Sequence, residues 1–138
     1  NEDAGYELRN PFFKGCIGTK SITFIRGNKP KPKGINIFEG FMDYLSVITQ
    51  QNGKRFEDDT IILNSLSCLK KATPYIQNYG YRSAYTWMDN DEAGRKATEV
   101  LDEYFKTQNF LEHIAMNEMY ESHKDVNAWH MANLGLRK

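Results

Sequence analysis

The sequence INIFEGFMD, residues 35–43, indicates the fold of this chain, because it leads from a short apolar strand into a helix through an acid and a glycine. Residues 35–38 predict the strand, and residues 41–51 carry apolar side chains at helical spacing. The same order recurs where a strand at residues 83–88 precedes the longest helical stripe of the chain, at residues 93–105. Strands that alternate with helices in this way predict an α/β fold.

The remaining segments extend this alternation. Residues 60–63 are an apolar, β-branched run typical of a buried parallel strand. Residues 113–116 predict a further strand, and residues 126–134 predict a closing helix that ends at a glycine. In the helical stretch after residue 63 we expect a break at Thr73-Pro74, since the residue before proline avoids the α conformation. We therefore expect a mainly parallel four-stranded sheet flanked by helices over residues 35–138.

Residues 1–34 have a different character and predict a β-hairpin arm followed by a linker. Short alternating runs at residues 6–10 and 21–26 are expected to pair with each other. Residues 27–34 are rich in lysine, proline and glycine, which is typical of a turn. The chain opens at Asn1 rather than Met, so we expect a piece of a longer protein.

Composition narrows the class of protein. With 138 residues, 40% hydrophobic and 26% charged, the chain fits one globular domain. Its formal net charge is zero, so any contact with nucleic acid must be local or assisted by metal. Cys16 and Cys68 form no Cys-x-x-Cys pattern, which argues against a zinc ribbon and fits the reducing cytoplasm. No apolar run reaches membrane-spanning length, so we expect no membrane contact.

Three acids, Glu39, Asp89 and Asp91, follow the ends of predicted strands. The carboxyl ends of parallel strands meet at one edge of a sheet, where functional sites of α/β folds lie. Carboxylate oxygens suit Mg²⁺, with Mn²⁺ as a possible substitute, and such ions promote phosphoryl transfer. The competing interpretation is that each acid caps a helix, and Asp91 is well placed for that role. The coincidence of three acids with strand ends favours a metal site.

Both acidic segments resemble the signature motifs of Toprim domains. Residues 35–43 are similar to the first motif, a strand that ends in Glu-Gly and is followed by an Asp. Residues 87–94, WMDNDEAG, are similar to the second motif, Asp-x-Asp-x-x-Gly. The form of the first motif, together with residues 14–20, most resembles the primase branch, particularly primase-like proteins of mobile elements. This resemblance implies a Toprim-like, Rossmann-like fold in which Glu39, Asp89 and Asp91 are catalytic and bind metal.

Further site residues follow from the same resemblance. Asp43 matches the second acid of the first motif and would bind metal or its water, with helix-start electrostatics as the alternative. The segment KDVN, residues 124–127, resembles a late primase motif in which Asn127 replaces the last acid. Asp125 is then a candidate second-metal ligand or a helix cap. Lys124 is a candidate phosphate contact or a solvated side chain.

The implied activity is Mg²⁺-dependent nucleotidyl transfer by the Toprim domain of a DNA primase-like protein, in replication or mobilisation of DNA. DNA template and nucleotides are the expected partners, and a helicase is a further candidate. We expect the fragment alone to be weak or inactive, since relatives bind template through flanking domains. Two alternatives stay open: a Toprim-type metal-dependent nuclease, and a non-catalytic module that binds DNA or a protein partner.

Overall fold

A computed structural model describes residues 22–54, 56–77, 79–108 and 111–135. Its centre is a five-stranded sheet with the strand order β1-β3-β2-β4-β5. The strands are β1 (Thr23–Ile25), β2 (Gly34–Phe38), β3 (Asp59–Ile62), β4 (Ser83–Trp87) and β5 (Glu112–Ala115). All neighbouring pairs are parallel except β1 and β3. The expected α/β class and mainly parallel sheet are confirmed.

The sheet has one strand more than the four expected. β1 comes from the predicted arm, but it pairs antiparallel with β3, with Phe24 opposite Ile61. The preceding residue, Ile22, is fully buried in the main core, so this segment gains apolar burial by joining the sheet. The other strand expected in the hairpin, residues 6–10, lies outside the described residues. The expected boundary after residue 34 falls just after the first residue of β2, a strand of the same sheet as β1.

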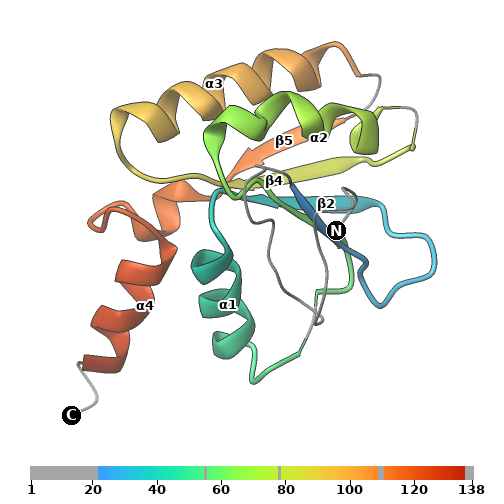
Figure 1. Cartoon of the computed structure of the whole chain (residues 1–138). Coiled ribbons are helices and arrows are strands. Elements are labelled where there is room, and N and C mark those ends of the chain that lie inside the picture. Colours follow the sequence, from blue (N-terminus) through green and yellow to red (C-terminus); the bar gives the residue numbers. More distant parts are fainter. Residues whose placement is uncertain (1–21, 55, 78, 109–110, 136–138) are drawn as a thin grey trace.

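Helices cover both faces of the sheet. They are α1 (Phe41–Gln50), α2 (Leu69–Ile76), α3 (Glu92–Lys106) and α4 (Val126–Gly135), with short 3₁₀ helices η1 (Leu66–Cys68) and η2 (Asn117–Tyr120). α2 and α3 lie over one face, α1 lies under the other, and α4 stands beside α1 (Figure 1). In the part of the chain that the structure describes, no helix has the length and apolar character to cross a bilayer.

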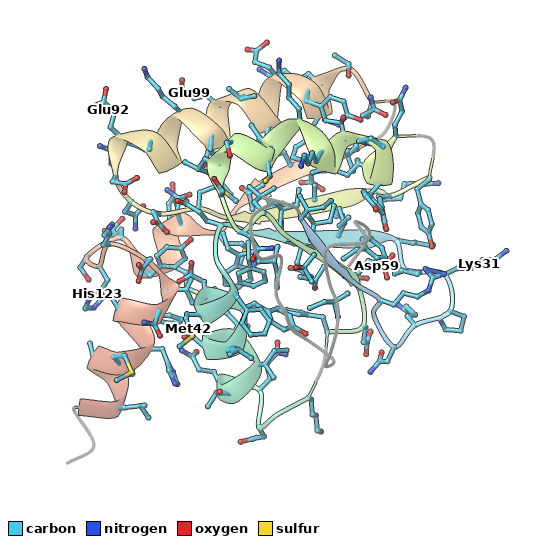
Figure 2. The ribbon with its side chains drawn as sticks, viewed as in Figure 1. Lys31, Met42, Asp59, Glu92, Glu99 and His123 are labelled. Carbon is cyan, nitrogen blue, oxygen red and sulfur yellow. The ribbon has the colours of Figure 1, made fainter. Side chains whose placement is uncertain are left out.

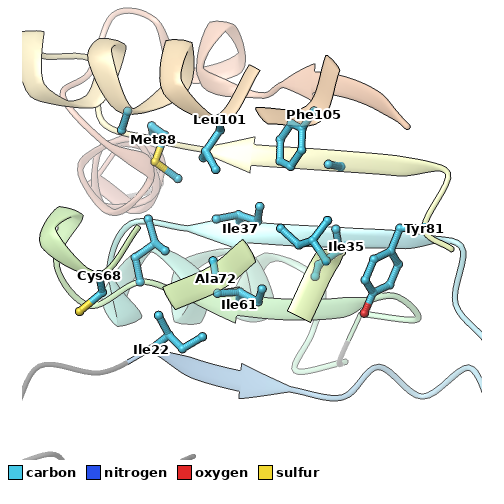
Figure 3. Close-up of a cluster of buried hydrophobic side chains, with 14 residues drawn as sticks. Ile22, Ile35, Ile37, Ile61, Cys68, Ala72, Tyr81, Met88, Leu101 and Phe105 are labelled. Carbon is cyan, nitrogen blue, oxygen red and sulfur yellow. The ribbon is translucent and has the colours of Figure 1, made fainter. Parts of the chain in front are cut away.

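Two apolar cores hold these layers together. The larger one lies between the sheet and the α2–α3 layer, and Figure 3 shows Ile35 and Ile37 of β2 facing Leu101 and Phe105 of α3. The smaller core lies on the α1 side, where the rings of Phe38 and Trp87 stack with centroids 5.0 Å apart. Alternate residues of a strand face opposite sides of a sheet, so one strand supplies both cores.

The break predicted at Thr73-Pro74 is wrong, because α2 continues through Pro74. Proline has no N–H to donate to the carbonyl four residues earlier, that of Lys70. The Thr73 hydroxyl donates to this Lys70 carbonyl at 3.0 Å instead. The substitute hydrogen bond removes one cost of the proline, and the buried Ala72 and Ile76 on the same helix favour its continuation.

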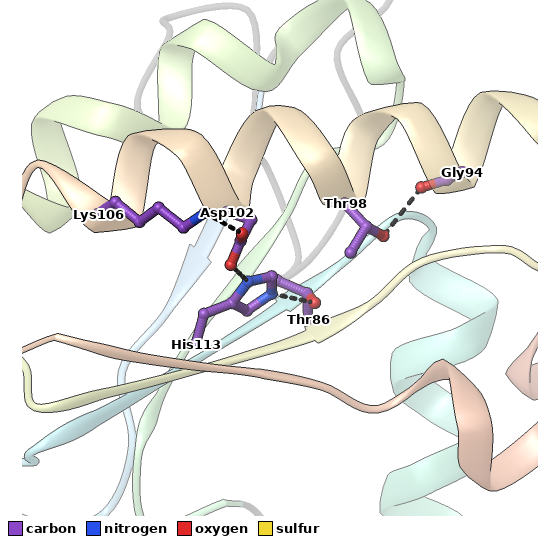
Figure 4. A network of polar contacts seen from close by, with 6 residues as sticks. All are labelled: Thr86, Gly94, Thr98, Asp102, Lys106 and His113. Carbon is purple, nitrogen blue, oxygen red and sulfur yellow. Dashed lines mark hydrogen bonds and ion pairs between the residues drawn. The ribbon is translucent and has the colours of Figure 1, made fainter.

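A polar network fastens α3 to the edge of the sheet, as Figure 4 shows. His113 of β5 lies between Asp102 of α3 and Thr86 of β4, at 2.8 Å from the oxygen of each. Lys106 forms an ion pair with Asp102 at 3.3 Å. The hydrogen bond from His113 and the contact with Lys106 lower the pKa of Asp102. The imidazole of His113 is therefore engaged in holding α3 on β4 and β5.

Candidate metal centre

Glu39 and Asp89 meet where β2 and β4 end. The two strands are parallel neighbours, and Phe38 lies opposite Trp87, so the residues that follow leave the sheet side by side. The backbone N–H of Asp89 donates to Glu39 Oε1 at 3.0 Å. The structure thus brings together the principal acids of the two motifs.

Two helices add further acids. Asp43 lies in the first turn of α1 and is 6% exposed, and its Oδ1 accepts a hydrogen bond from the backbone N–H of Asn127 at 3.1 Å. Asp125 directly precedes α4. The charges of Glu39 and Asp125 both act on Asp43, which places these acids in one cluster.

Main-chain N–H groups orient most of these carboxylates. Besides Glu39 and Asp43, Asp91 accepts from the N–H of Gly94 at 2.7 Å, and Asp125 accepts from the N–H of Ala128 at 2.7 Å. Asp91 and Asp125 are therefore helix caps, as the simpler interpretation expected. Because a carboxylate has two oxygens, a cap occupies only one of them, and the other remains for a cation.

Asp89 differs from the other four acids. Within the described residues its carboxylate accepts no hydrogen bond. Burial and, after it, the charges of the other four acids, that of Glu39 most, together raise its pKa from 3.8 to about 7. The pKa of Asp43 is raised to about 6, again mainly by burial. Such values indicate concentrated negative charge that a cation would relieve.

The stability of the metal-free chain should therefore depend on pH. Asp43 and Asp89 have higher pKa values in the folded than in the unfolded state, so the folded state binds more protons between about pH 4 and pH 7. The free energy of unfolding should fall as pH rises through this window and then level off. The lowered pKa of Asp102 affects stability only near and below the ordinary aspartate pKa of 3.8, outside this window. Urea unfolding between pH 5 and pH 8 measures the trend.

Millimolar Mg²⁺ should restore stability at pH 8 more than at pH 5, because the ion binds the ionised acids. A metal-free chain that becomes more stable between pH 5 and pH 8 would contradict the charge balance described here.

The five acids supply the oxygen ligands that a hard divalent cation prefers, although the described side chains do not form a complete coordination shell. Among the described residues, no three acid, histidine or cysteine side chains converge closely enough to hold one ion together. Mg²⁺ takes few protein carboxylates and keeps several waters, so close convergence is not required. The carboxylate oxygens of these acids, and the negative charge of Asp89 beside the other four, suit such an ion.

The two other residues of the late motif behave differently. The Lys124 side chain is exposed, while its carbonyl accepts from the N–H of Asn90 at 2.6 Å. Asn127 accepts from the Ser46 hydroxyl at 3.0 Å and thus joins α4 to α1. Asn127 is therefore a structural contact beside Asp43.

The role of Asn90 could not be predicted from the sequence. Its side chain contacts carbonyl groups 27 to 33 residues further along the chain. The only signal in the sequence is its position between Asp89 and Asp91, and no local pattern predicts partners at that separation. Tyr120, which donates its hydroxyl to the Met88 carbonyl at 2.7 Å, was missed for the same reason.

A mainly parallel α/β sheet with an acidic carboxyl edge defines a class of domains suited to binding a divalent cation beside phosphate. The family model described as Toprim-like matches residues 36–130 of this chain. The chain therefore belongs to the Toprim-like family, and the expected fold is confirmed.

A solved structure places the chain close to the primase branch. It is similar to the crystal structure of the primase fragment of the bacteriophage T7 primase-helicase protein, with 27% sequence identity and a TM-score of 0.53. The match covers 75% of this chain and 40% of that fragment, so the chain spans less than half the length of this neighbour. The comparison with curated proteins gave no match.

Proposed function

We propose that this chain is the Mg²⁺-dependent nucleotidyl-transfer domain of a primase-like protein that acts on DNA. One observation carries the proposal: five acids gather at the carboxyl edge of the sheet, and the pKa of Asp89 rises to about 7 because of burial and the other four. Structural stability alone does not favour such a concentration of like charge. Binding of a divalent cation would explain it, and the similarity to a phage primase fragment supports phosphoryl transfer on nucleic acid as the reaction.

In this proposal Glu39, Asp89 and Asp91 hold the cation, Asp43 contributes from the first turn of α1, and Asp125 contributes from the position just before α4. Bound Mg²⁺ would neutralise phosphate oxygens and lower the pKa of an attacking hydroxyl. The chain's own contribution is orientation: the N–H of Asp89 holds one oxygen of Glu39, and the N–H of Asn127 holds Asp43. Lys124, which is exposed next to Asp125, would contact a phosphate of template or nucleotide.

The test uses the full-length protein with single-stranded DNA template, nucleotides and Mg²⁺. Glu39→Gln should lower primer synthesis at least about tenfold, because it removes a charge that the cation needs and keeps the shape of the side chain. The matched control is Glu99→Gln on α3, whose exposed side chain points away from the sheet into solvent (Figure 2). It should leave synthesis unchanged. Primer synthesis that survives Glu39→Gln at the native rate would overturn the proposal.

The same assay separates the alternatives. Metal-dependent nicking of plasmid DNA without nucleotide incorporation would indicate a Toprim nuclease built on the same acids. Failure of the native chain to bind Mg²⁺ or Mn²⁺ in calorimetry would indicate a non-catalytic binding module.

The neighbour's description as a primase-helicase suggests a helicase, on the same chain or a separate one, as the partner. A role in DNA replication or mobilisation implies action in the cytoplasm. Binding of a helicase to the full-length protein is directly measurable by co-purification of the two defined proteins.

A further inference from the structure

Asn90 lies between two acids of the second motif and contacts residues 117–124. Its Nδ2 lies 3.2, 3.0 and 3.0 Å from the carbonyl oxygens of Asn117, Tyr120 and His123. Its Oδ1 accepts a hydrogen bond from Asn117 Nδ2 at 3.1 Å. An amide NH₂ group has two hydrogens, so three carbonyls share them and the side chain is fully engaged.

The main chain of Asn90 extends this connection toward the acids. Its N–H donates to the carbonyl of Lys124 at 2.6 Å, and the next residue is Asp125. Asp125 then caps α4 through the N–H of Ala128. The position of Asp125 relative to Asp89 therefore depends on contacts that Asn90 makes.

The segment that Asn90 holds has little regular structure of its own. It contains the four-residue helix η2 and a turn before α4. Tyr120 anchors one point, since its hydroxyl donates to the Met88 carbonyl and its side chain is 1% exposed. The Tyr120 carbonyl also accepts from the N–H of His123 at 2.9 Å, and the Asn90 amide joins it to the carbonyls of two other residues in this segment.

We propose that Asn90 is a positioning residue, which holds residues 117–124 so that Asp125 joins Asp89 at the same cation. This inference rests on the proposed function, because it assumes that the acids bind a divalent ion. Asn90 touches neither substrate nor ion in this proposal. It acts through the segment that ends at Asp125, and so couples the late motif to the second motif.

The test compares the native 138-residue chain with Asn90→Ala, Asp125→Asn and the double variant. Two measurements are made: hydrogen exchange of residues 117–124 without metal, and binding of Mn²⁺ alone by electron paramagnetic resonance. In Asn90→Ala, exchange in this segment should rise about tenfold or more, while exchange in α1 stays native. Asp125→Asn should weaken Mn²⁺ binding about tenfold in the native background and less than about twofold in the Asn90→Ala background.

This difference between backgrounds is the decisive readout, because a purely structural role for Asn90 would leave the effect of Asp125→Asn unchanged. Equal effects of Asp125→Asn in both backgrounds would overturn the inference. If Asn90→Ala does not fold, Asn117→Ala removes one of the same hydrogen bonds, and equal effects in its background would overturn the inference likewise. A native chain that binds no Mn²⁺ would overturn the proposed function, while native exchange of residues 117–124 in Asn90→Ala would overturn the positioning role alone.

Discussion

Replacing Asp89 with asparagine should stabilise the metal-free chain at pH 8 and, at the same time, weaken divalent-cation binding about 100-fold or more. The stabilisation follows from the raised pKa of Asp89. At pH 8 the Asp89 carboxylate is ionised beside four other acids and has no hydrogen-bond donor among the described residues, so removal of its charge relieves repulsion in the folded chain. A full conversion of the shift from 3.8 to about 7 would correspond to about 4 kcal/mol. Because Asp89 is partly exposed and water screens its charge, we expect about 1–2 kcal/mol.

The loss of cation binding has a separate cause. Mutation of a residue that only orients a metal ligand lowers metal affinity by about 10–100-fold. Loss of the charge of a ligand itself should therefore lower the affinity for Mg²⁺ by about 100-fold or more. Urea unfolding at pH 8 and calorimetry with Mg²⁺ measure the two effects on one variant. Glu99→Gln, which removes a charge from the solvent-exposed surface of α3, should change neither quantity. An Asp89→Asn chain that is less stable than native at pH 8 would contradict the proposed charge repulsion, and native affinity for Mg²⁺ would contradict the metal site.

Gly94→Ala should destabilise the chain by about 3 kcal/mol and displace the second motif, although alanine normally favours a helix. A Cβ atom at Gly94 would lie 2.1 Å from the carbonyl oxygen of Asp89, far inside van der Waals contact. The helix cannot shift freely, because the N–H of Gly94 donates to the Asp91 cap at 2.7 Å. Thermal unfolding of the metal-free chain is the measurement.

The glycine of the first motif provides the matched control. A Cβ atom at Gly40 would meet only Asp43 Oδ2, at an ordinary 3.5 Å, and its φ of −133° suits any residue. Gly40→Ala should therefore change the free energy of unfolding by less than about 1 kcal/mol. A Gly94→Ala chain that is as stable as the native chain would contradict this distinction between the two motif glycines. A Gly40→Ala chain that loses as much stability as Gly94→Ala would contradict it as well.

Much of the candidate site could be predicted because its principal acids follow strand ends. Glu39 and Asp89 needed only the strand pattern and the rule that neighbouring parallel strands end at one edge, and the structure brings them within one hydrogen bond. The sequence could not choose between capping and metal binding for Asp91 and Asp125. The structure shows that both acids cap helices, which leaves one carboxylate oxygen of each for a cation.

The order of strands and helices from residue 34 onward was determined by the sequence itself, because apolar periods of two and about 3.6 residues are local properties. The tertiary structure alone decided that β1 joins the sheet as a fifth strand and that α2 continues through Pro74. It alone decided the contacts of Asn90 and the raised pKa of Asp89. These features depend on which distant groups are buried together. Burial and long-range hydrogen bonds arise only when the layers pack, so no local pattern records them.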